Sequence, residues 1–428
     1  MNSYFLKIFL SALSLIVSVH SLSQPSNDTI QTQEVKEILY YLASDELKGR
    51  VNFSEEQLTA ASYISDHFKK SGLQPFPGYN DFYLPFRTDG KTNIPAADVL
   101  KWNKKRLSSS AFVLLSPSLN TTSRQLDDFK LIRSDNPLED STLFTYWQDS
   151  TNVLLWIKSE KDLLPSNIIL PKGRPASDIL IVVNSQAPTA IKLSRRNDFV
   201  NSILYNVVGV LPGKSKPGEA ILFSAHYDHV STGIDGSSGG IFNGANDDAS
   251  GTTAVMMLAK YYALKNDNAR TLIFCAFAGE ESGLLGSKVF SEEISPETIV
   301  AGINIEMIGH YNAVGKNAIY ITGEKFSSLA SIMKNNFEGS GFKIKEEPDL
   351  SKNLFMRSDN YPFVRKGIPA HSIMSSDDDD PCYHRPCDDA ETIDVENMTA
   401  IIKAITAGCK TIVAGEETPS RVDVKRLQ

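Results

Sequence analysis

Hydrophobic and polar positions follow distinct patterns in successive parts of the chain. Residues 35–47 and 55–73 place apolar side chains three and four positions apart, which predicts two amphipathic helices. The second pattern ends at Lys69-Lys70-Ser71-Gly72, where cations in the last turn and a following glycine favour a helix stop. The region from 93 to 188 holds short apolar runs between polar turns, which predicts an inserted β-rich subdomain. These runs are 112–115, 153–158 and 179–184.

From Tyr205 onward, apolar runs of strand length alternate with helical patterns. Predicted strands lie at 207–210, 220–225, 271–276, 303–307, 319–322 and 370–374. Predicted helices lie at 252–264, 283–293, 326–337 and 395–413. Short apolar strands between helices are typical of a largely parallel sheet that is covered on both faces. The sequence therefore predicts an α/β fold with a discontinuous main domain, residues 24–92 and 189–428, around the insert at 93–188.

The first residues have the layout of a secretory signal peptide. Residues 1–7 carry one positive charge, nine of the twelve residues 8–19 are apolar, and Ser21 and Ser23 form a small-residue cleavage pattern. The apolar run is shorter than the ~20 residues that span a bilayer, which argues against a membrane helix. We therefore expect residues 1–23 to be removed by cleavage near Ser23. The mature protein would be secreted or periplasmic, without stable membrane association.

Composition narrows the class of protein. The chain has 428 residues and a formal net charge of −8, and this mildly acidic balance argues against a protein built to bind nucleic acid. Hydrophobic residues make up 41% and charged residues 22%, which is typical of globular proteins and excludes a disordered or fibrous chain. Four cysteines in this length exclude a fold held together mainly by disulfides.

Acidic and imidazole side chains follow the predicted strands at their carboxyl ends, where ligands bind in sheets of this kind. They are His226 and Asp228, Asp247 and Asp248, Glu280 and Glu281, Glu306, and His384 and Asp388. Most of them, taken singly, have an ordinary explanation, such as a solvated loop for the histidines or a helix N-cap for Asp247 and Asp248. Asp228 faces the same way as His226 in an extended chain, which is typical of a metal ligand and a group that orients it.

The adjacent carboxylates of Glu280 and Glu281 are harder to explain without a cation. They repel one another, and a metal bound by one of them, with the other beside a metal-bound water, would remove that repulsion. Gly279 and Gly283 permit the sharp turn around the pair. The candidate ligands are carboxylates and imidazoles with no thiolate, which favours zinc, with cobalt or manganese as alternatives. The sequence thus predicts a two-zinc hydrolase site.

The segments that carry these residues resemble the co-catalytic zinc aminopeptidase family, which includes bacterial leucyl aminopeptidases and, as relatives, glutamate carboxypeptidase and glutaminyl cyclase. The matching strings are SAHYDHV, NGANDDASGTTAVMMLA, FAGEESGLLGS, INIEMIG, SDNYPFVRKGIPA and YHRPCDD, in the family's order. The resemblance covers residues 35–86 and 205–413. It implies a three-layer zinc-exopeptidase fold with a mostly parallel mixed sheet between helices. Many relatives insert a protease-associated or lid domain at the place of the intervening region.

The resemblance also implies how the ligands are shared between two zinc ions. His226 and Glu306 would bind one zinc, and Glu281 and His384 would bind the other. Asp247 would bridge the two ions, and the peptide bond that follows it is often cis in relatives. The family usually has Asp in place of Glu306, and the extra methylene predicts a metal that is held more loosely.

The remaining roles also follow from the resemblance. Glu280 would be the general base, and Tyr383 would stabilise the oxyanion that forms on the substrate. Three carboxylates would orient the ligands from behind: Asp228, Asp248 and Asp388. Asn360 stands where the family often has His, and because that position is usually not a ligand, we expect little effect.

We therefore expect an exported two-zinc metallopeptidase that removes N-terminal residues from peptides or proteins. A hydroxide shared by the two metals would attack the first peptide carbonyl, while Glu280 carries the proton to the leaving amine. The alternatives are a one-zinc glutaminyl-cyclase-like acyltransferase, a carboxypeptidase or amidase on the same metals, and an inactive binding module. The presence of both His226 and Glu306 favours the peptidase, because the cyclase relatives typically lose the second-metal set.

Three further features have more than one interpretation. Asp377–Asp380 forms either a solvated loop or an acidic rim that attracts the positive N-terminus of a peptide. Cys382 and Cys387 flank His384, either as a local disulfide or as free thiols. Three histidines show no ligand spacing, and we interpret them as structural or surface residues: His229, His310 and His371. The sequence predicts no oligomeric state.

Overall fold

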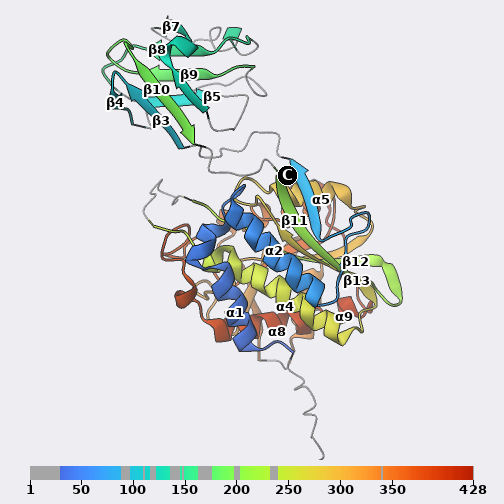
Figure 1. The fold of residues 1–428 in the computed structure, drawn as a ribbon. Coiled ribbons are helices and arrows are strands. Elements are labelled where there is room, and N and C mark those ends of the chain that lie inside the picture. The colour runs from blue at the N-terminus through green and yellow to red at the C-terminus, as the bar shows by residue number, and fades with distance from the viewer. Residues whose placement is uncertain are drawn as a thin grey trace, which may run out of the picture.

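A computed structural model gives the architecture of the chain (Figure 1). It describes residues 29–87, 97–108, 111–115, 122–134, 145–146, 149–161, 176–196, 203–231, 240–338 and 341–427. The predicted signal peptide, residues 1–23, lies outside these ranges, and its cleavage stays a prediction. Within these ranges, no helix combines the length and the apolar character that crossing a membrane requires.

A nine-stranded sheet forms the centre of the larger unit. Its strands follow the order β1-β11-β13-β12-β14-β17-β15-β16, and β2 pairs with β11. The bounds are β1 (Gln74–Pro75), β2 (Tyr83–Arg87), β11 (Ile203–Leu211), β12 (Lys216–His226), β13 (Arg270–Phe277), β14 (Ile299–Ile305), β15 (Ala318–Ile321), β16 (Lys343–Lys345) and β17 (Ala370–Met374). The four central strands β13, β12, β14 and β17 are parallel, whereas β11 and β15 run antiparallel to their neighbours β13 and β17. The sheet is thus mixed, with a parallel centre.

Helices cover both faces of this sheet because side chains of each strand alternate between two core layers. In β13, Leu272 and Phe274 belong to one apolar cluster, while Ile273 and Phe277 belong to the other. The first cluster packs under α1 (Thr32–Leu42), α2 (Glu55–Lys70), α4 (Ser250–Lys265), α6 (Leu329–Asn336), α8 (Val395–Gly408) and α9 (Lys410–Val413). The second cluster packs under α5 (Leu285–Glu293) and α7 (Tyr361–Val364). Most of the covering helices are in view in Figure 1.

The helix ends follow local signals in the sequence. Ser54 caps α2 by accepting the backbone N–H of Gln57 at 3.0 Å, and Asp394 caps α8 in the same way. The predicted helix at 395–413 is divided at Cys409, directly after Gly408, whose propensity for helix is poor. Short 3-10 turns lie at Asp45–Arg50, Leu126–Asp128, Glu324–Phe326, Leu350–Lys352, Leu354–Met356, Ala390–Thr392 and Val424–Leu427, and a π-turn at Ala245–Ala249.

A second, smaller unit consists of two four-stranded sheets, with the orders β4-β3-β10-β6 and β5-β9-β8-β7. The strands are β3 (Ala97–Trp102), β4 (Lys105–Arg106), β5 (Phe112–Leu115), β6 (Thr122–Gln125), β7 (Lys130–Ser134), β8 (Val153–Ile157), β9 (Ile179–Val183) and β10 (Ile191–Arg196). Leu100 and Leu193 of the first sheet share a buried cluster with Leu154 and Leu180 of the second. The two sheets therefore pack on each other with an apolar core of their own.

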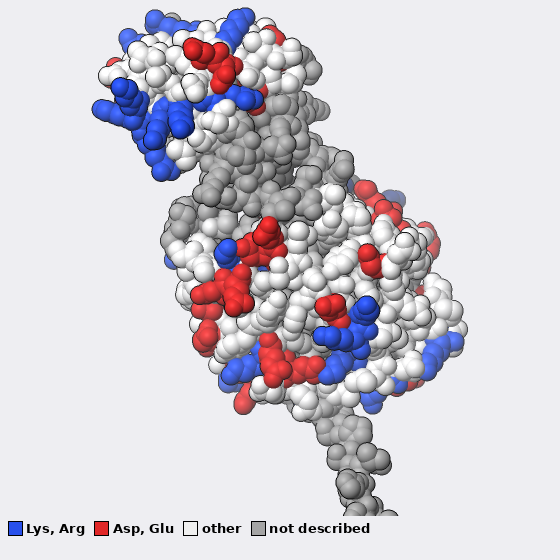
Figure 2. All heavy atoms as spheres, in the orientation of Figure 1, with Lys and Arg blue, Asp and Glu red and all other residues white. Residues whose placement is uncertain are grey.

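The apolar runs predicted as strands at 112–115, 153–158 and 179–184 form β5, β8 and β9 of this β-rich unit. β10 extends the unit beyond residue 188, because it pairs along its length with β3. The domain boundaries themselves stay a prediction. Figure 2 shows Lys and Arg side chains gathered on one side of the β-rich unit, while Asp and Glu are prominent on the visible face of the larger unit.

Candidate metal centre

The strands of the parallel centre deliver the candidate residues to one edge of the sheet. His226 is the last residue of β12, and Glu306 follows β14 directly. Glu280 and Glu281 follow β13 after a turn in which Gly279 has a φ of 78°, a conformation that glycine adopts at little cost. Asp247 lies in the π-turn before α4. The common direction of the strands, not their order in the chain, brings these side chains together.

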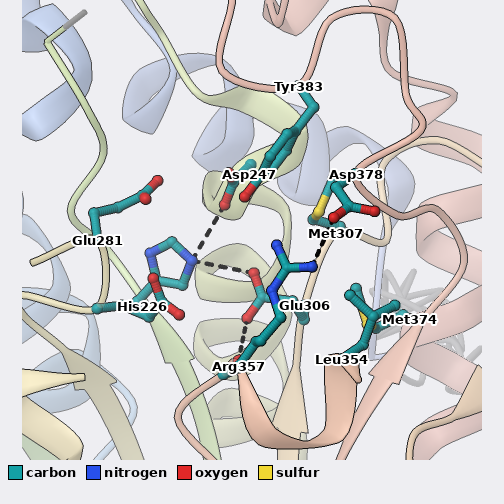
Figure 3. A pocket seen from close by; sticks show the side chains of 12 residues that line it. His226, Asp247, Glu281, Glu306, Met307, Leu354, Arg357, Met374, Asp378 and Tyr383 are labelled. Atoms are coloured by element: carbon teal, nitrogen blue, oxygen red, sulfur yellow. Dashed lines mark hydrogen bonds and ion pairs between the residues drawn. The ribbon is translucent and has the colours of Figure 1, made fainter. Parts of the chain in front are cut away.

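A first cluster joins the ends of β12 and β14. Nε2 of His226 lies 3.2 Å from Oδ1 of Asp247 and 3.1 Å from Oε1 of Glu306. All three side chains are buried. Figure 3 shows the imidazole of His226 facing both carboxylates, so three potential ligand atoms converge on one point.

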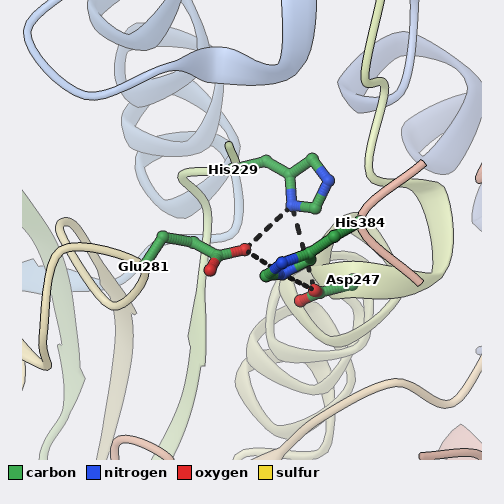
Figure 4. A group of neighbouring side chains, drawn as sticks. All are labelled: His229, Asp247, Glu281 and His384. Carbon is green, nitrogen blue, oxygen red and sulfur yellow. Dashed lines mark hydrogen bonds and ion pairs between the residues drawn. The ribbon is translucent and has the colours of Figure 1, made fainter. Parts of the chain in front are cut away.

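A second cluster lies on the other side of Asp247. Nε2 of His384 is 3.0 Å from Oδ2 of Asp247 and 3.0 Å from Oε1 of Glu281. Figure 4 shows these groups together with the imidazole of His229. Asp247 therefore directs one carboxylate oxygen to each cluster. The bond between Asp247 and Asp248 is cis, as it often is in the relatives named above.

His229 was not among the predicted site residues, yet it lies in the second cluster. Its Nδ1 is 3.0 Å from Oε1 of Glu281. Two residues separate it from His226, and that spacing indicates no common face in an irregular loop. Its proximity to a strand end was the only signal in the sequence. The other two histidines interpreted as structural or surface residues make ordinary contacts: His371 with Ser327, and His310 with Asp380.

The two clusters have the chemistry of a metal centre. Carboxylate oxygens and imidazole nitrogens are the ligands that zinc takes in hydrolytic sites. Nε2 of His384 is buried and has no hydrogen-bond partner in the described part of the chain, although two carboxylate oxygens lie 3.0 Å away. A buried imidazole nitrogen without a hydrogen-bond partner fits a metal ligand, because its lone pair points to the place where the carboxylates converge. The residues present therefore fit zinc.

Asp228 supports the site in a way that its spacing did not predict. Nδ1 of His226 lies 3.0 Å from the backbone carbonyl of Asp228, whereas the nearer side-chain oxygen is 3.9 Å away. The carboxylate instead accepts the backbone N–H groups of Gly279, Glu280 and Glu281, at 2.8, 3.1 and 3.3 Å. Asp228 thus holds the turn that presents the two glutamates, and Asn52 donates to it at 2.8 Å.

Asp388 and Asp248 fix the segment around Asp247. Asp388 accepts the backbone N–H groups of Asn246 and Asp247, at 2.7 and 3.1 Å. Asp248 accepts the N–H of Met307 at 3.1 Å and thereby ties the π-turn to the end of β14. Both carboxylates are buried and hold backbone that carries a ligand.

The surroundings push the pKa values of the two adjacent glutamates in opposite directions. Burial raises the pKa of Glu280 well above its ordinary value; His226 opposes the rise and Glu281 adds to it. Burial and Asp247 also act to raise the pKa of Glu281, but hydrogen bonds from His229 and His384 outweigh them and lower it. Neighbouring carboxyls with divergent pKa values are typical of an acid–base group beside a permanently charged one.

Comparison with known sequences finds a family match over the segment that carries this site. Residues 206–408 match the sequence model described as Peptidase family M28. Over this segment the chain is similar to peptidase family M28. Both clusters, Glu280 and the loop around His384 lie within the matching residues. This match supports the expected zinc-dependent hydrolase, and it bears out the family resemblance of the strings that carry the candidate residues.

The curated relatives of the M28 segment are considerably longer than the shared region. Aminopeptidase YwaD of Bacillus subtilis (strain 168) is 26% identical over 242 residues, which cover 52% of this chain and 48% of that protein. Vacuolar membrane protease of Schizosaccharomyces pombe is 36% identical over 155 residues, which cover 34% of this chain and 17% of that protein. The chain thus spans about half the length of these relatives, or less.

Solved structures share the fold over nearly the whole chain. BSAP, a zinc aminopeptidase from Bacillus subtilis, superposes with a TM-score of 0.59 at 19% identity, covering 90% of this chain and 95% of that one. The aminopeptidase from Aneurinibacillus sp. strain AM-1 gives 0.54 at 18%, covering 90% and 94%. A glutaminyl cyclase from Bacteroides thetaiotaomicron gives 0.52 at 13%, covering 91% and 99%. This likeness confirms the expected α/β fold class.

A pocket opens beside the first cluster of the M28 segment. Its lining includes Glu280 and residues of both clusters, together with Met307, Leu354, Met374, Arg357, Asp378 and Tyr383, and Figure 3 shows most of these side chains. The guanidinium of Arg357 pairs with Asp378 at 2.7 Å. The pocket thus combines candidate ligands with the apolar side chains of Met307, Leu354 and Met374.

The acidic run at Asp377–Asp380 forms ion pairs within the M28 segment. Lys352 lies 2.9, 2.9 and 2.7 Å from the carboxylates of Asp377, Asp378 and Asp379, respectively. Asp380 pairs with His310 at 2.5 Å. This pairing weakens the interpretation as an acidic rim, because most of the negative charge faces cations of the same chain.

A disulfide closes the loop that carries His384. Cys382 and Cys387 are joined, with 5.2 Å between their Cα atoms, so the local pairing rather than free thiols is what the structure has. His384 itself has a φ of 50°. The short closed loop restricts the backbone on both sides of this candidate ligand.

Proposed function

We propose that the protein is an exported two-zinc aminopeptidase that hydrolyses the first peptide bond of peptides or proteins with a free N-terminus. One observation carries the proposal: the two oxygens of Asp247 face separate clusters, each of which contains at least one imidazole and a further carboxylate. A shared carboxylate between two complete ligand sets is the arrangement that a pair of metal ions requires. The M28 family match and the aminopeptidases among the relatives support the same reaction class.

His226, Asp247 and Glu306 would hold one zinc, and Asp247, Glu281 and His384 would hold the other. When bound, the two ions supply Lewis acidity, which polarises the substrate carbonyl and lowers the pKa of water. The pocket beside them orients the peptide and excludes bulk water from the reacting carbonyl. Asp228 and Asp388 hold the backbone of the ligand-bearing turns, so the ligands keep their positions when the substrate enters.

Glu280 would move the proton. Its side chain lines the pocket and is not needed as a ligand, and its raised pKa suits a group that takes a proton from water and returns it to the leaving amine. Tyr383 lies at the same pocket. Burial and the carboxylates of Asp247 and Glu281 raise the pKa of Tyr383, so its phenol stays protonated and can donate to the substrate oxyanion.

A one-zinc glutaminyl cyclase is the second candidate, because a protein with that name shares the fold. Completeness of both clusters favours two metals over one. A carboxypeptidase or amidase on the same centre is a third candidate. Export and the secreted or periplasmic location rest on the signal peptide predicted for residues 1–23.

Metal analysis and a panel of substrates test the proposal together. The purified mature chain should contain two zinc ions, and should cleave aminoacyl anilides with a free amine much faster than the same anilides after N-acetylation. Removal of zinc by a chelator should abolish cleavage, and added zinc should restore it. Equal rates on free and acetylated substrates would contradict the aminopeptidase, and cyclisation of N-terminal glutamine with a single zinc would establish the cyclase instead.

A further inference from the structure

The second cluster has one member more than the family resemblance implies. The ring of His229 is 1% exposed, and its Nδ1 lies 3.0 Å from Oε1 of Glu281 and 3.9 Å from Oδ2 of Asp247. We propose that Nδ1 of His229 is a fourth protein ligand of the second metal, which makes the two metal sites unequal. This inference rests on the proposed two-metal function and deepens it.

The distances between the ligand atoms fit a four-coordinate ion. Nε2 of His384 lies 3.0 Å from both Oδ2 of Asp247 and Oε1 of Glu281, and Nδ1 of His229 adds separations of 3.0 and 3.9 Å to the same two oxygens. A tetrahedral zinc with bonds of about 2.0–2.1 Å has ligand atoms roughly 3.3 Å apart. All four atoms lie within 4.8 Å of one another. In Figure 4 the two imidazoles approach the carboxylates from different directions, as tetrahedral ligands must.

The backbone around His229 is shaped to hold the ring in place. Gly244 has a φ of 57°, and a Cβ at this position would lie 2.5 Å from Cγ of His229. The guanidinium of Arg50 donates to the carbonyls of Tyr227 and Gly244, at 2.7 and 3.1 Å, and so fixes the chain on both sides of the ring. A histidine enclosed in this way is positioned and is not a mobile loop residue.

The two sites then differ in the number of protein ligands. The first cluster offers three ligand atoms, from His226, Asp247 and Glu306, whereas the second offers four. Zinc sites with four protein ligands are closed and hold the metal tightly, while sites with three keep a position for water or substrate. The pocket is lined by all three residues of the first cluster and by Glu281, but not by His229 or His384. The second ion is therefore the tightly held one, and the first is the exchangeable ion that faces the substrate.

Stepwise metal titration of the metal-free protein tests this inequality without relying on activity. Wild type should bind two Co²⁺ ions in separate steps, with the first step at least about 100-fold tighter and with the intense visible absorption of four-coordinate Co²⁺. Substitution His229→Asn removes the ring nitrogen but keeps a side chain of similar reach. It should weaken metal binding in the tight step by about 100-fold or more and reduce the visible absorption of Co²⁺. Loss of a group that only orients a ligand already weakens metal binding by about 10–100-fold.

A matched variant and the zinc count separate this inference from the proposed function. His67→Asn replaces a histidine that contacts the carbonyl of Met256, and should leave both binding steps unchanged. If His229→Asn titrates as wild type does, or if wild type binds two ions with equal affinity, His229 is not a ligand and the inference fails. The proposed peptidase would still stand in that case, provided that two zinc ions are bound and free aminoacyl anilides are cleaved. Failure of wild type to bind a second ion would overturn both.

Discussion

The hydroxyl of Ser358 donates a hydrogen bond of 2.6 Å to Oε2 of Glu306, while Oε1 of the same carboxylate faces His226 at 3.1 Å. The contact changes the expectation that the longer Glu306 holds its metal loosely. One oxygen is anchored, and Asn304 supports the anchor by donating to Ser358 at 2.8 Å. The extra methylene of Glu306 lets one carboxylate oxygen reach Ser358 while the other reaches the ligand position beside His226. The carboxylate is therefore less mobile than it would be without the bond to Ser358.

Substitution Ser358→Ala should weaken metal binding at the first site by about 10–100-fold, because it removes the partner that orients Glu306. Competition with a metal indicator dye measures this affinity directly. Ser291→Ala is a matched control, since the hydroxyl of Ser291 donates at 2.8 Å to the carbonyl of Lys288 within α5. Unchanged affinity in Ser358→Ala would show that Glu306 is held by its other neighbours.

Substitution Glu280→Gln should leave the zinc content at two per chain and lower kcat by about 10³-fold or more, because the amide cannot accept the proton of the attacking water. The measurement combines metal analysis with steady-state kinetics on a free aminoacyl anilide. Glu297→Gln, at an exposed position before β14, should behave as wild type. Near-normal turnover in Glu280→Gln would remove this residue from the proposed proton transfer.

Substitution Arg50→Lys should destabilise the protein by about 3 kcal/mol, because the buried guanidinium donates to the carbonyls of Leu42, Tyr227, Asn243 and Gly244 and an ammonium cannot reach them all. Burial lowers the pKa of Arg50 to about 10, while nearby carboxylates oppose the shift, so the group stays charged at neutral pH. The shift of the urea unfolding midpoint measures the loss. Lys48→Ala, in the same segment but exposed, should leave the unfolding midpoint close to that of wild type.

The pair formed by His310 and Asp380 should make stability depend on pH. Burial disfavours the charged imidazole, but the bond to Asp380 outweighs it and raises the pKa of His310. The pKa of Asp380 is lowered: burial acts against the charge, and His310 overcomes it. The contribution of His310 is complete below its ordinary pKa of about 6.5 and is lost as the pH rises through the raised value, while that of Asp380 is lost in acid.

Wild type should therefore exceed His310→Asn in unfolding free energy by about 1.5 kcal/mol near pH 5–6, and the difference should shrink toward alkaline pH. Urea denaturation at several pH values tests this trend. His67 gives a control of opposite sign: burial lowers its pKa, although the carbonyl of Met256 opposes the change. The advantage of wild type over His67→Asn should shrink as the pH falls below about 6.5. A His310→Asn difference that is constant with pH would mean that the imidazole is not charged in the pair.

Much of the fold could be predicted because local pattern and tertiary environment agree in the parallel centre. The apolar run at 271–276 lies within β13, where both faces are covered and every position favours an apolar residue. The run at 395–413 predicted one helix and forms two, since helical periodicity does not reveal a break after Gly408. β1 and β2 were not predicted, because edge strands next to β11 owe their form to pairing with a distant segment.

The sequence by itself determined which metal-ligating residue types follow the strands. Parallel strands end at the same edge of a sheet, so the residues at their carboxyl ends lie along that edge. The sequence therefore predicted His226, Glu281 and Glu306 at one place. Only the tertiary structure decided that His229 joins the second cluster, and that Asp228 holds the turn of Glu280 and Glu281 and not the ring of His226. Those contacts depend on loop backbone fixed by Arg50 and Gly244, two residues separated by nearly two hundred positions, and no local periodicity encodes such a distance.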